Sequence, residues 1–185
     1  ENSGVEAAAN YAINKINSPY FTRIDADDSV ESQYLSHFNK VIDSNKNYDF
    51  IYSNYNLINH NSYTIKNIKL PKFDKEEIFK RGDFLATGTL YKKETIDSLN
   101  QYDTTNKNCG LENYSLILRL IIQNYSGIHI PYTLFNYRIH SNNMSKKRKD
   151  SILKYGNELT TKLLNRTYEV NCNHYNLGTV FSVIK

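Results

Sequence analysis

The chain has 185 residues, a mass of 21.6 kDa and 39% hydrophobic residues, which fits one domain with a buried core. No apolar run has the length of a membrane span and no signal peptide pattern is visible, so we expect a soluble protein in the cytosol. The two cysteines, Cys109 and Cys172, are too few for a disulfide framework or a zinc site, and the net charge is only +4.

The first third of the chain predicts helix, strand, helix and strand in that order. Residues 4–16 are Ala-rich with apolar side chains at helical spacing, which indicates a helix. Residues 20–24 form a short apolar strand that ends abruptly in acidic residues. Apolar positions within residues 34–42 repeat at intervals of three and four, which predicts an amphipathic helix packed on the sheet, and residues 49–53 follow as a buried strand. The result is a β-α-β unit with the acids in its loop.

The remainder predicts further elements of the same domain. Alternating apolar and polar residues between 54 and 73 indicate hairpin strands with one solvated face. Residues 111–123 are apolar on nearly every side, which places this helix beneath the sheet. Gly88, inside a strand pattern, marks a close approach of backbone or ligand. Other expected helices are 75–80, 94–99 and 150–164, and other expected strands are 84–91, 128–130, 134–139 and 180–184. We assign residues 1–149 to the main domain and residues 150–185 to a closing helix and tail on it.

Asp25, Asp27 and Asp28 bring three acids within four residues at the end of a strand. Neighbouring like charges cost free energy unless a cation neutralises them, and hard oxygen ligands suit Mg²⁺ or Mn²⁺. Ligands of open α/β sheets bind outside the carboxyl ends of strands, which agrees with this position. The alternative is that Asp28 or Ser29 caps a helix that starts near Val30.

Three stretches of the chain resemble motifs of family 2 glycosyltransferases in the expected order. Residues 2–28 are similar to the run N-x-G, A-R-N and a strand leading into D-x-D-D. Residues 110–120 are similar to the helix with Glu-Asp-Tyr-x-Leu-x-x-Arg-Leu, and residues 137–145 to Tyr-Arg-x-His-x-x-x-x-Ser. The resemblance covers about residues 2 to 145, and these motifs at these separations make it specific.

The resemblance implies an α/β fold of the GT-A type, a Rossmann-like three-layer arrangement with a mixed sheet flanked by helices. The chain starts at the N-x-G segment, so we expect it to lack the first nucleotide-binding strand of the family. The implied function is a metal-dependent inverting glycosyltransferase of polysaccharide biosynthesis. It would move a sugar from a nucleotide-diphosphate donor, expected to be UDP-linked, to a hydroxyl of a cell-surface glycan or lipid-linked saccharide.

The resemblance also implies roles for individual residues. Asp27 and His140 would be the ligands of Mn²⁺ or Mg²⁺, although a lone His at a strand end is more often an ordinary hydrogen-bonded surface residue. Five residues would contact the donor: Asn2, Gly4, Asp25, Asp28 and Arg138.

Catalysis would depend on Glu112 and Asn113. The family carries Asp at the position of Asn113, and an amide cannot accept a proton, so either Glu112 acts as the general base or this copy is impaired. The alternative for Glu112 is simply a favourable charge at a helix N-terminus. Ala9 replaces a family arginine, which removes one cation near the acids. A catalytically impaired scaffold that acts as a binding module is therefore the alternative function.

Lys146, Lys147, Arg148 and Lys149 form a basic run that is most often a solvated helix start. Contact with phosphate or with the anionic inner face of the membrane is the second interpretation. We expect no nucleic-acid partner, because acids at the cleft repel phosphate unless a metal intervenes.

Overall fold

The computed structural model describes residues 3–44, 46–81, 85, 88–143, 147–164, 169–171 and 182–184. Its main sheet is mixed, with the strand order β1-β5-β3-β6-β2 and with β4 paired to β3. These strands are β1 (Tyr20–Thr22), β2 (Ser29–Val30), β3 (Phe50–Ile58), β4 (Thr64–Ile68), β5 (Leu90–Lys92) and β6 (Gly127–Arg138); β7 (Glu169–Asn171) and β8 (Ser182–Ile184) form a separate antiparallel pair. The helices are α1 (Val5–Ile13), α2 (Tyr34–Ile42), α3 (Lys75–Arg81), α4 (Lys93–Ser98), α5 (Glu112–Ile122) and α7 (Lys149–Leu164).

Strand β3 organises the sheet because it is buried along almost its whole length. It pairs in parallel with β6 and antiparallel with β5, and β1 is also antiparallel to β5. Strands β1, β3 and β6 therefore run in the same direction. The carboxyl ends of β1 and β6 consequently lie toward the same edge of the sheet, where open α/β folds bind their ligands.

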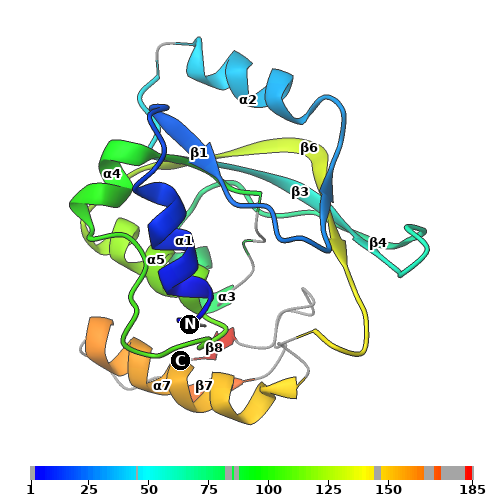
Figure 1. Ribbon diagram of the computed structural model, residues 1–185. Coiled ribbons are helices and arrows are strands. Elements are labelled where there is room, and N and C mark those ends of the chain that lie inside the picture. The colour runs from blue at the N-terminus through cyan, green and yellow to red at the C-terminus, as the bar shows by residue number, and fades with distance from the viewer. Residues whose placement is uncertain are drawn as a thin grey trace.

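Helix α2 covers one face of the sheet (Figure 1). Tyr34 and Phe38, both on its apolar stripe, are buried and pack with Ile51, Ile130 and other sheet residues. The rings of Tyr34 and Phe38 meet edge to face at 4.5 Å. The 3.6-residue period of the sequence therefore correctly predicts both this helix and its inward face.

Helices α1, α3 and α5 lie on the opposite face, and α7 lies beyond α5 (Figure 1). Helix α5 is buried on nearly every side, as its apolar sequence predicts. Its Leu116 and Leu120 belong to the cluster under the sheet, whereas its Tyr114 and Leu118 pack with Ile152 of α7. Helix α5 thus joins the sheet core to the last helix, which explains why it has no polar stripe.

Two sequence expectations about the acidic loop and the sheet need correction. The helix after the acidic loop begins at Tyr34 rather than near residue 30, and Ser29–Val30 form strand β2, so Asp28 does not cap a helix. The expected strands 128–130 and 134–139 are one continuous strand, β6, which passes through Pro131. Pro131 has no backbone N–H to donate, and the pairing of β3 with β6 shifts register around it, so the irregularity replaces the expected break.

Gly88 lies in a turn before β5 rather than inside a strand over residues 84–91, and its close neighbour is an aromatic side chain rather than backbone or a ligand. Its φ is +89°, and a Cβ built there would lie 2.6 Å from Cδ2 of Phe135. We predict that Gly88→Ala lowers the free energy of unfolding by about 2 kcal/mol or more, because it adds both backbone strain and a clash in the core. Urea unfolding measures the change.

Gly110→Ala is the matched control for backbone strain, because Gly110 also has a positive φ, of 73°. If the two variants lose equal stability, the contact with Phe135 contributes nothing and the packing argument for Gly88 is wrong.

Candidate functional site

The loop after β1 directs its three carboxylates to three different partners. Its turn is closed by the N–H of Asp28, which donates to the carbonyl of Asp25 at 3.0 Å. The Asp25 carboxylate faces an arginine, the Asp27 carboxylate faces a histidine, and the Asp28 carboxylate accepts a backbone N–H. The like charges of this loop are therefore separated by their partners rather than held against one another.

Asp27 and His140 meet across the loop although they lie 113 positions apart in the sequence. Nε2 of His140 is 2.9 Å from Oδ2 of Asp27, and both side chains are partly open to solvent, with exposed fractions of 32% and 42%. Nδ1 of His140 accepts the N–H of Asn142 at 3.1 Å, which holds the ring with Nε2 toward Asp27. The two predicted metal ligands are thus brought together.

The donor chemistry of this pair fits a divalent ion. A carboxylate oxygen and a neutral imidazole nitrogen are both used by Mn²⁺, and both side chains remain accessible. A divalent ion would be held by the carboxylate of Asp27 and Nε2 of His140, and it would take the place of the hydrogen bond between these two side chains.

Arg138 joins the acidic loop to the turn between β3 and β4. Its backbone N–H donates to Oδ1 of Asp28 at 2.9 Å, and its Nε donates to the carbonyl of Asp27 at 2.7 Å. Its Nη1 donates to the carbonyl of Asn59 at 2.7 Å and to Oγ of Ser62 at 3.2 Å. The described contacts of Arg138 are therefore with the protein itself, and its part in donor binding stays a prediction.

Arg23, which the sequence analysis does not single out, is the central cation of the site. Its Nε and Nη2 donate to the two oxygens of Asp25 at 2.9 and 3.2 Å, and Nη2 also donates to Oε1 of Glu112 at 3.0 Å. Its side chain is only 18% exposed. The sequence did contain a signal for this role. Arg23 lies within a short apolar stretch that predicts a strand, and a charge buried there requires a partner of opposite charge.

Glu112 and Asn113 lie side by side at the start of α5 but have different environments. The Glu112 side chain is 7% exposed and is paired with Arg23. Asn113 accepts a hydrogen bond from the hydroxyl of Tyr102 at 3.2 Å. Burial raises the pKa of Tyr102 to about 12, so this hydroxyl remains a neutral donor.

Asn10 of the predicted A-R-N segment holds the backbone of Tyr102. Its Nδ2 donates to the Tyr102 carbonyl and its Oδ1 accepts the Tyr102 N–H, both at 2.9 Å. The Tyr102 ring in turn lies 5.9 Å from the guanidinium carbon of Arg23. Helix α1 therefore supports the site through Tyr102.

The two remaining predicted donor contacts lie at the start of the chain. Asn2 lies outside the described residues. Gly4 has a φ of +95°, and a Cβ there would lie 2.7 Å from Cγ of Lys107. Gly4 thus packs closely on the loop before α5, and its role toward a donor stays a prediction.

Glu6, Cys109 and Glu112 form a second group of metal-type ligand atoms, all within 4.8 Å of one another. Both oxygens of Glu6 already accept backbone N–H groups, from Asn108 and Cys109 at 2.9 Å. Burial raises the pKa of the Cys109 thiol to about 12, so this side chain is a protonated thiol in this arrangement. This group is therefore a hydrogen-bonded clamp between α1 and the loop before α5.

The raised pKa of Cys109 predicts a slow thiol. A group with a raised pKa stays protonated up to that pH, so at pH 8 the thiolate fraction is roughly 10³-fold below that of an ordinary cysteine. We expect iodoacetamide to label Cys109 slower by about that factor in the folded protein. Mass spectrometry of the Cys172→Ser variant follows Cys109 by itself, and urea provides the unfolded control. Rapid labelling at pH 8 in native buffer would contradict this interpretation.

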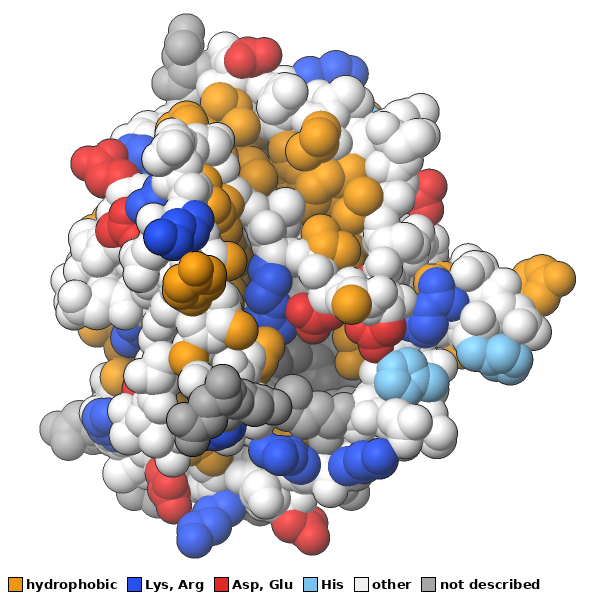
Figure 2. Space-filling model, in the orientation of Figure 1, with side chains coloured by type: hydrophobic (Ala, Val, Ile, Leu, Met, Phe, Trp, Pro, Cys, Tyr) orange, Lys and Arg blue, Asp and Glu red, His pale blue; other side chains and the backbone are white. Residues whose placement is uncertain are grey.

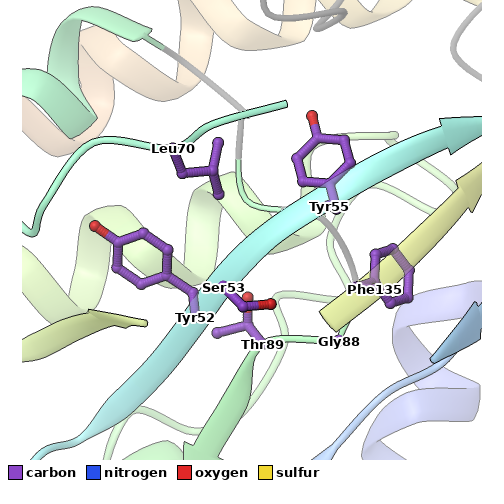
Figure 3. A pocket seen from close by; sticks show the side chains of 7 residues that line it. All are labelled: Tyr52, Ser53, Tyr55, Leu70, Gly88, Thr89 and Phe135. Carbon is purple, nitrogen blue, oxygen red and sulfur yellow. The ribbon is translucent and has the colours of Figure 1, made fainter. Parts of the chain in front are cut away.

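A small cavity lies between β3, β6 and the segment before β5 (Figure 3). The backbone N–H of Gly88, which lines it, donates to the carbonyl of Arg23 at 2.8 Å. The Ser53 and Thr89 side chains lie close together in its wall, and the Phe135 ring closes it next to Gly88 (Figure 3). Its other lining residues are Tyr52, Tyr55 and Leu70.

Figure 2 shows the face that carries the loop. Acidic and basic side chains lie side by side at a hollow in its middle, with a histidine at the margin.

The basic run is described only in part. Lys147 and Arg148 are exposed, and Nη1 of Arg148 donates to the carbonyl of Asn108 at 2.8 Å. Lys146 and the side chain of Lys149 lie outside the described residues. Contact with a membrane surface stays a prediction, and none of the described helices has the length and apolar character needed to cross a bilayer.

Known proteins similar to this chain agree with one another. Residues 1–105 match the family model "Glycosyl transferase family 2". An uncharacterized glycosyltransferase of Methanocaldococcus jannaschii is 27% identical over 160 residues, which is 83% of this chain and 54% of that protein. The chain thus spans about half the length of this curated relative.

Solved structures of TarS from S. aureus have the same fold. The structure of TarS residues 1–349 with UDP-GlcNAc has a TM-score of 0.62 at 8% identity, over 87% of this chain and 48% of that chain. The structure of TarS residues 1–349 with UDP has a TM-score of 0.58 at 11% identity, over 90% of this chain and 52% of that chain. The expected GT-A fold is confirmed, and the family match covers more than half of the sequence. The chain therefore belongs to glycosyl transferase family 2.

Proposed function

We propose that this chain transfers a sugar from a nucleotide-diphosphate donor to a hydroxyl group of a glycan or lipid-linked saccharide. One observation carries the proposal: Asp27 and His140, from the segments after β1 and β6, meet at 2.9 Å, and Arg23 joins Asp25 of the same loop to the buried carboxylate of Glu112. A UDP-linked donor is supported by the TarS structures, whose titles name UDP-GlcNAc and UDP.

Asp27 and His140 would hold Mn²⁺ or Mg²⁺, which when bound offsets the negative charge of the donor's diphosphate. Asp25 and Asp28 shape the loop around these ligands through their bonds to Arg23 and to the backbone of Arg138. Glu112 is the general base: it takes the proton of the acceptor hydroxyl as the new glycosidic bond forms. A base opposite the leaving group gives inversion at the anomeric carbon.

A second function is favoured by two details of the same site. Asn113 cannot accept a proton, and Oε1 of Glu112 is already engaged by Arg23. A scaffold that binds a nucleotide sugar without turning it over would have these features.

Calorimetry with UDP and an assay of UDP release separate the two functions. For a transferase we expect UDP to bind in Mn²⁺, EDTA to weaken that binding about tenfold or more, and UDP to be released from a UDP sugar. Binding with no release from UDP-GlcNAc, UDP-glucose or UDP-galactose favours the scaffold. If UDP does not bind with or without Mn²⁺, both functions are wrong.

A further inference from the structure

Arg23 connects two segments that the proposed reaction must bring together. It directly follows β1, and its guanidinium contacts both Asp25 of the acidic loop and Glu112 at the start of α5. Glu112 lies 89 positions away from Arg23 in the sequence. Nη2 alone contacts both acids, at 3.2 Å to Oδ2 of Asp25 and 3.0 Å to Oε1 of Glu112. One nitrogen thus fixes the distance between loop and helix.

The charges of this group explain why it holds its geometry. One guanidinium pairs with both carboxylates, and the side chains of Arg23 and Glu112 are only 18% and 7% exposed, so loss of Arg23 would leave the Glu112 carboxylate buried without this cationic partner. Nη1 of Arg23 is buried and has no hydrogen-bond partner among the described residues. This unpaired donor indicates that the contacts with Asp25 and Glu112 determine the orientation of the guanidinium, at the cost of one hydrogen bond from Nη1.

We propose that Arg23 is a positioning residue for Glu112, an inference that rests on the proposed transferase function. Arg23 anchors Oε1, which leaves Oε2 to take the acceptor's proton. The acceptor oxygen then bonds to the anomeric carbon, the bond from that carbon to the diphosphate breaks, and its electron pair leaves with UDP. Because the same guanidinium also donates to Asp25, it fixes the position of the base relative to the acidic loop.

The planar fork matters as well as the charge. A lysine at position 23 keeps one positive charge but is a point donor that cannot bridge both acids with fixed directions. A displacement of about 1 Å between base and substrate costs about 10²-fold in rate. A positive charge at position 23 is therefore not enough to position Glu112; the two-directional hydrogen bonding of arginine is also needed.

The test measures UDP release from UDP-GlcNAc, UDP-glucose and UDP-galactose in wild type, R23K, R23M, E112Q and R23M/E112Q. We expect R23K and R23M to lower kcat about 10²-fold, with KM for the donor and the calorimetric affinity for UDP within about twofold of wild type. The double variant should be no slower than E112Q, because Arg23 acts through Glu112. Unchanged UDP affinity also shows that each variant is folded.

Other outcomes overturn the proposal in recognisable ways. If the losses in R23M and E112Q multiply in the double variant, Arg23 does not act through Glu112. If KM and UDP affinity change about tenfold or more while kcat holds, Arg23 is a donor contact. If R23K and R23M both fail to fold, its role is stability alone. A wild type that binds UDP but releases none from any of the sugars, or an E112Q variant at full rate, refutes the proposed function itself, and the Arg23 inference with it.

Discussion

Replacing Asp27 with asparagine is expected to abolish the metal dependence of UDP binding and to lower UDP release by about 10³-fold. Asparagine keeps the size of the side chain but loses its charge, and a bound metal contributes several kcal/mol to stabilising a phosphate leaving group, at 1.36 kcal/mol per tenfold in rate. The carboxylate that contacts His140 becomes an amide, and an amide oxygen binds a divalent ion more weakly than a carboxylate oxygen does. Calorimetry with UDP in Mn²⁺ and in EDTA measures the first effect.

Asp43→Asn is the control, because Asp43 is an exposed acid at the end of α2. It removes the same charge without touching the acidic loop. If Asp27→Asn binds UDP in Mn²⁺ as tightly as Asp43→Asn does, the pair Asp27 and His140 is not a metal site.

The second large effect is expected for Glu112→Gln. Glutamine retains an oxygen that accepts from Arg23 but cannot take a proton, so kcat should fall by about 10²–10⁴-fold, the usual contribution of a general base. UDP affinity should remain within about twofold, because Glu112 acts on the acceptor side. Steady-state UDP release together with UDP calorimetry separates these effects.

Asn113→Asp gives the matched comparison at the neighbouring position. It restores the family's acid where Tyr102 donates its hydroxyl hydrogen bond. If Asn113→Asp raises turnover while Glu112→Gln leaves it unchanged, position 113 rather than Glu112 is the position for the base.

The regular parts of the fold could be predicted because their causes are local. Apolar positions at a 3.6-residue period predict α2 and its buried face, and the absence of a polar stripe predicts a buried α5. The path of β6 through Pro131 could not be predicted in the same way. A proline usually interrupts a strand, and only the pairing with β3 keeps this strand continuous.

The site was predictable in part. Asp27 and His140 come together as the family resemblance implies, although spacing alone predicts only an ion near the acids. Arg23 was missed because its importance depends on Glu112, which is remote in the sequence and close only after α5 packs under the sheet. Arg138 was predicted as a donor contact, but its described bonds to the turn after β3 could not be predicted, because they depend on how β6 lies beside that strand.

Arg138 has a consequence for how this family member can vary. Its guanidinium ties the backbone of Asp27 to the short connection between β3 and β4, through Asn59 and Ser62. Inserting or deleting residues in that connection would pull on the acidic loop even though neither predicted metal ligand is altered. The length of the connection between β3 and β4 is therefore constrained by the acidic loop. A hairpin transplanted from a relative should preserve residues 59–62.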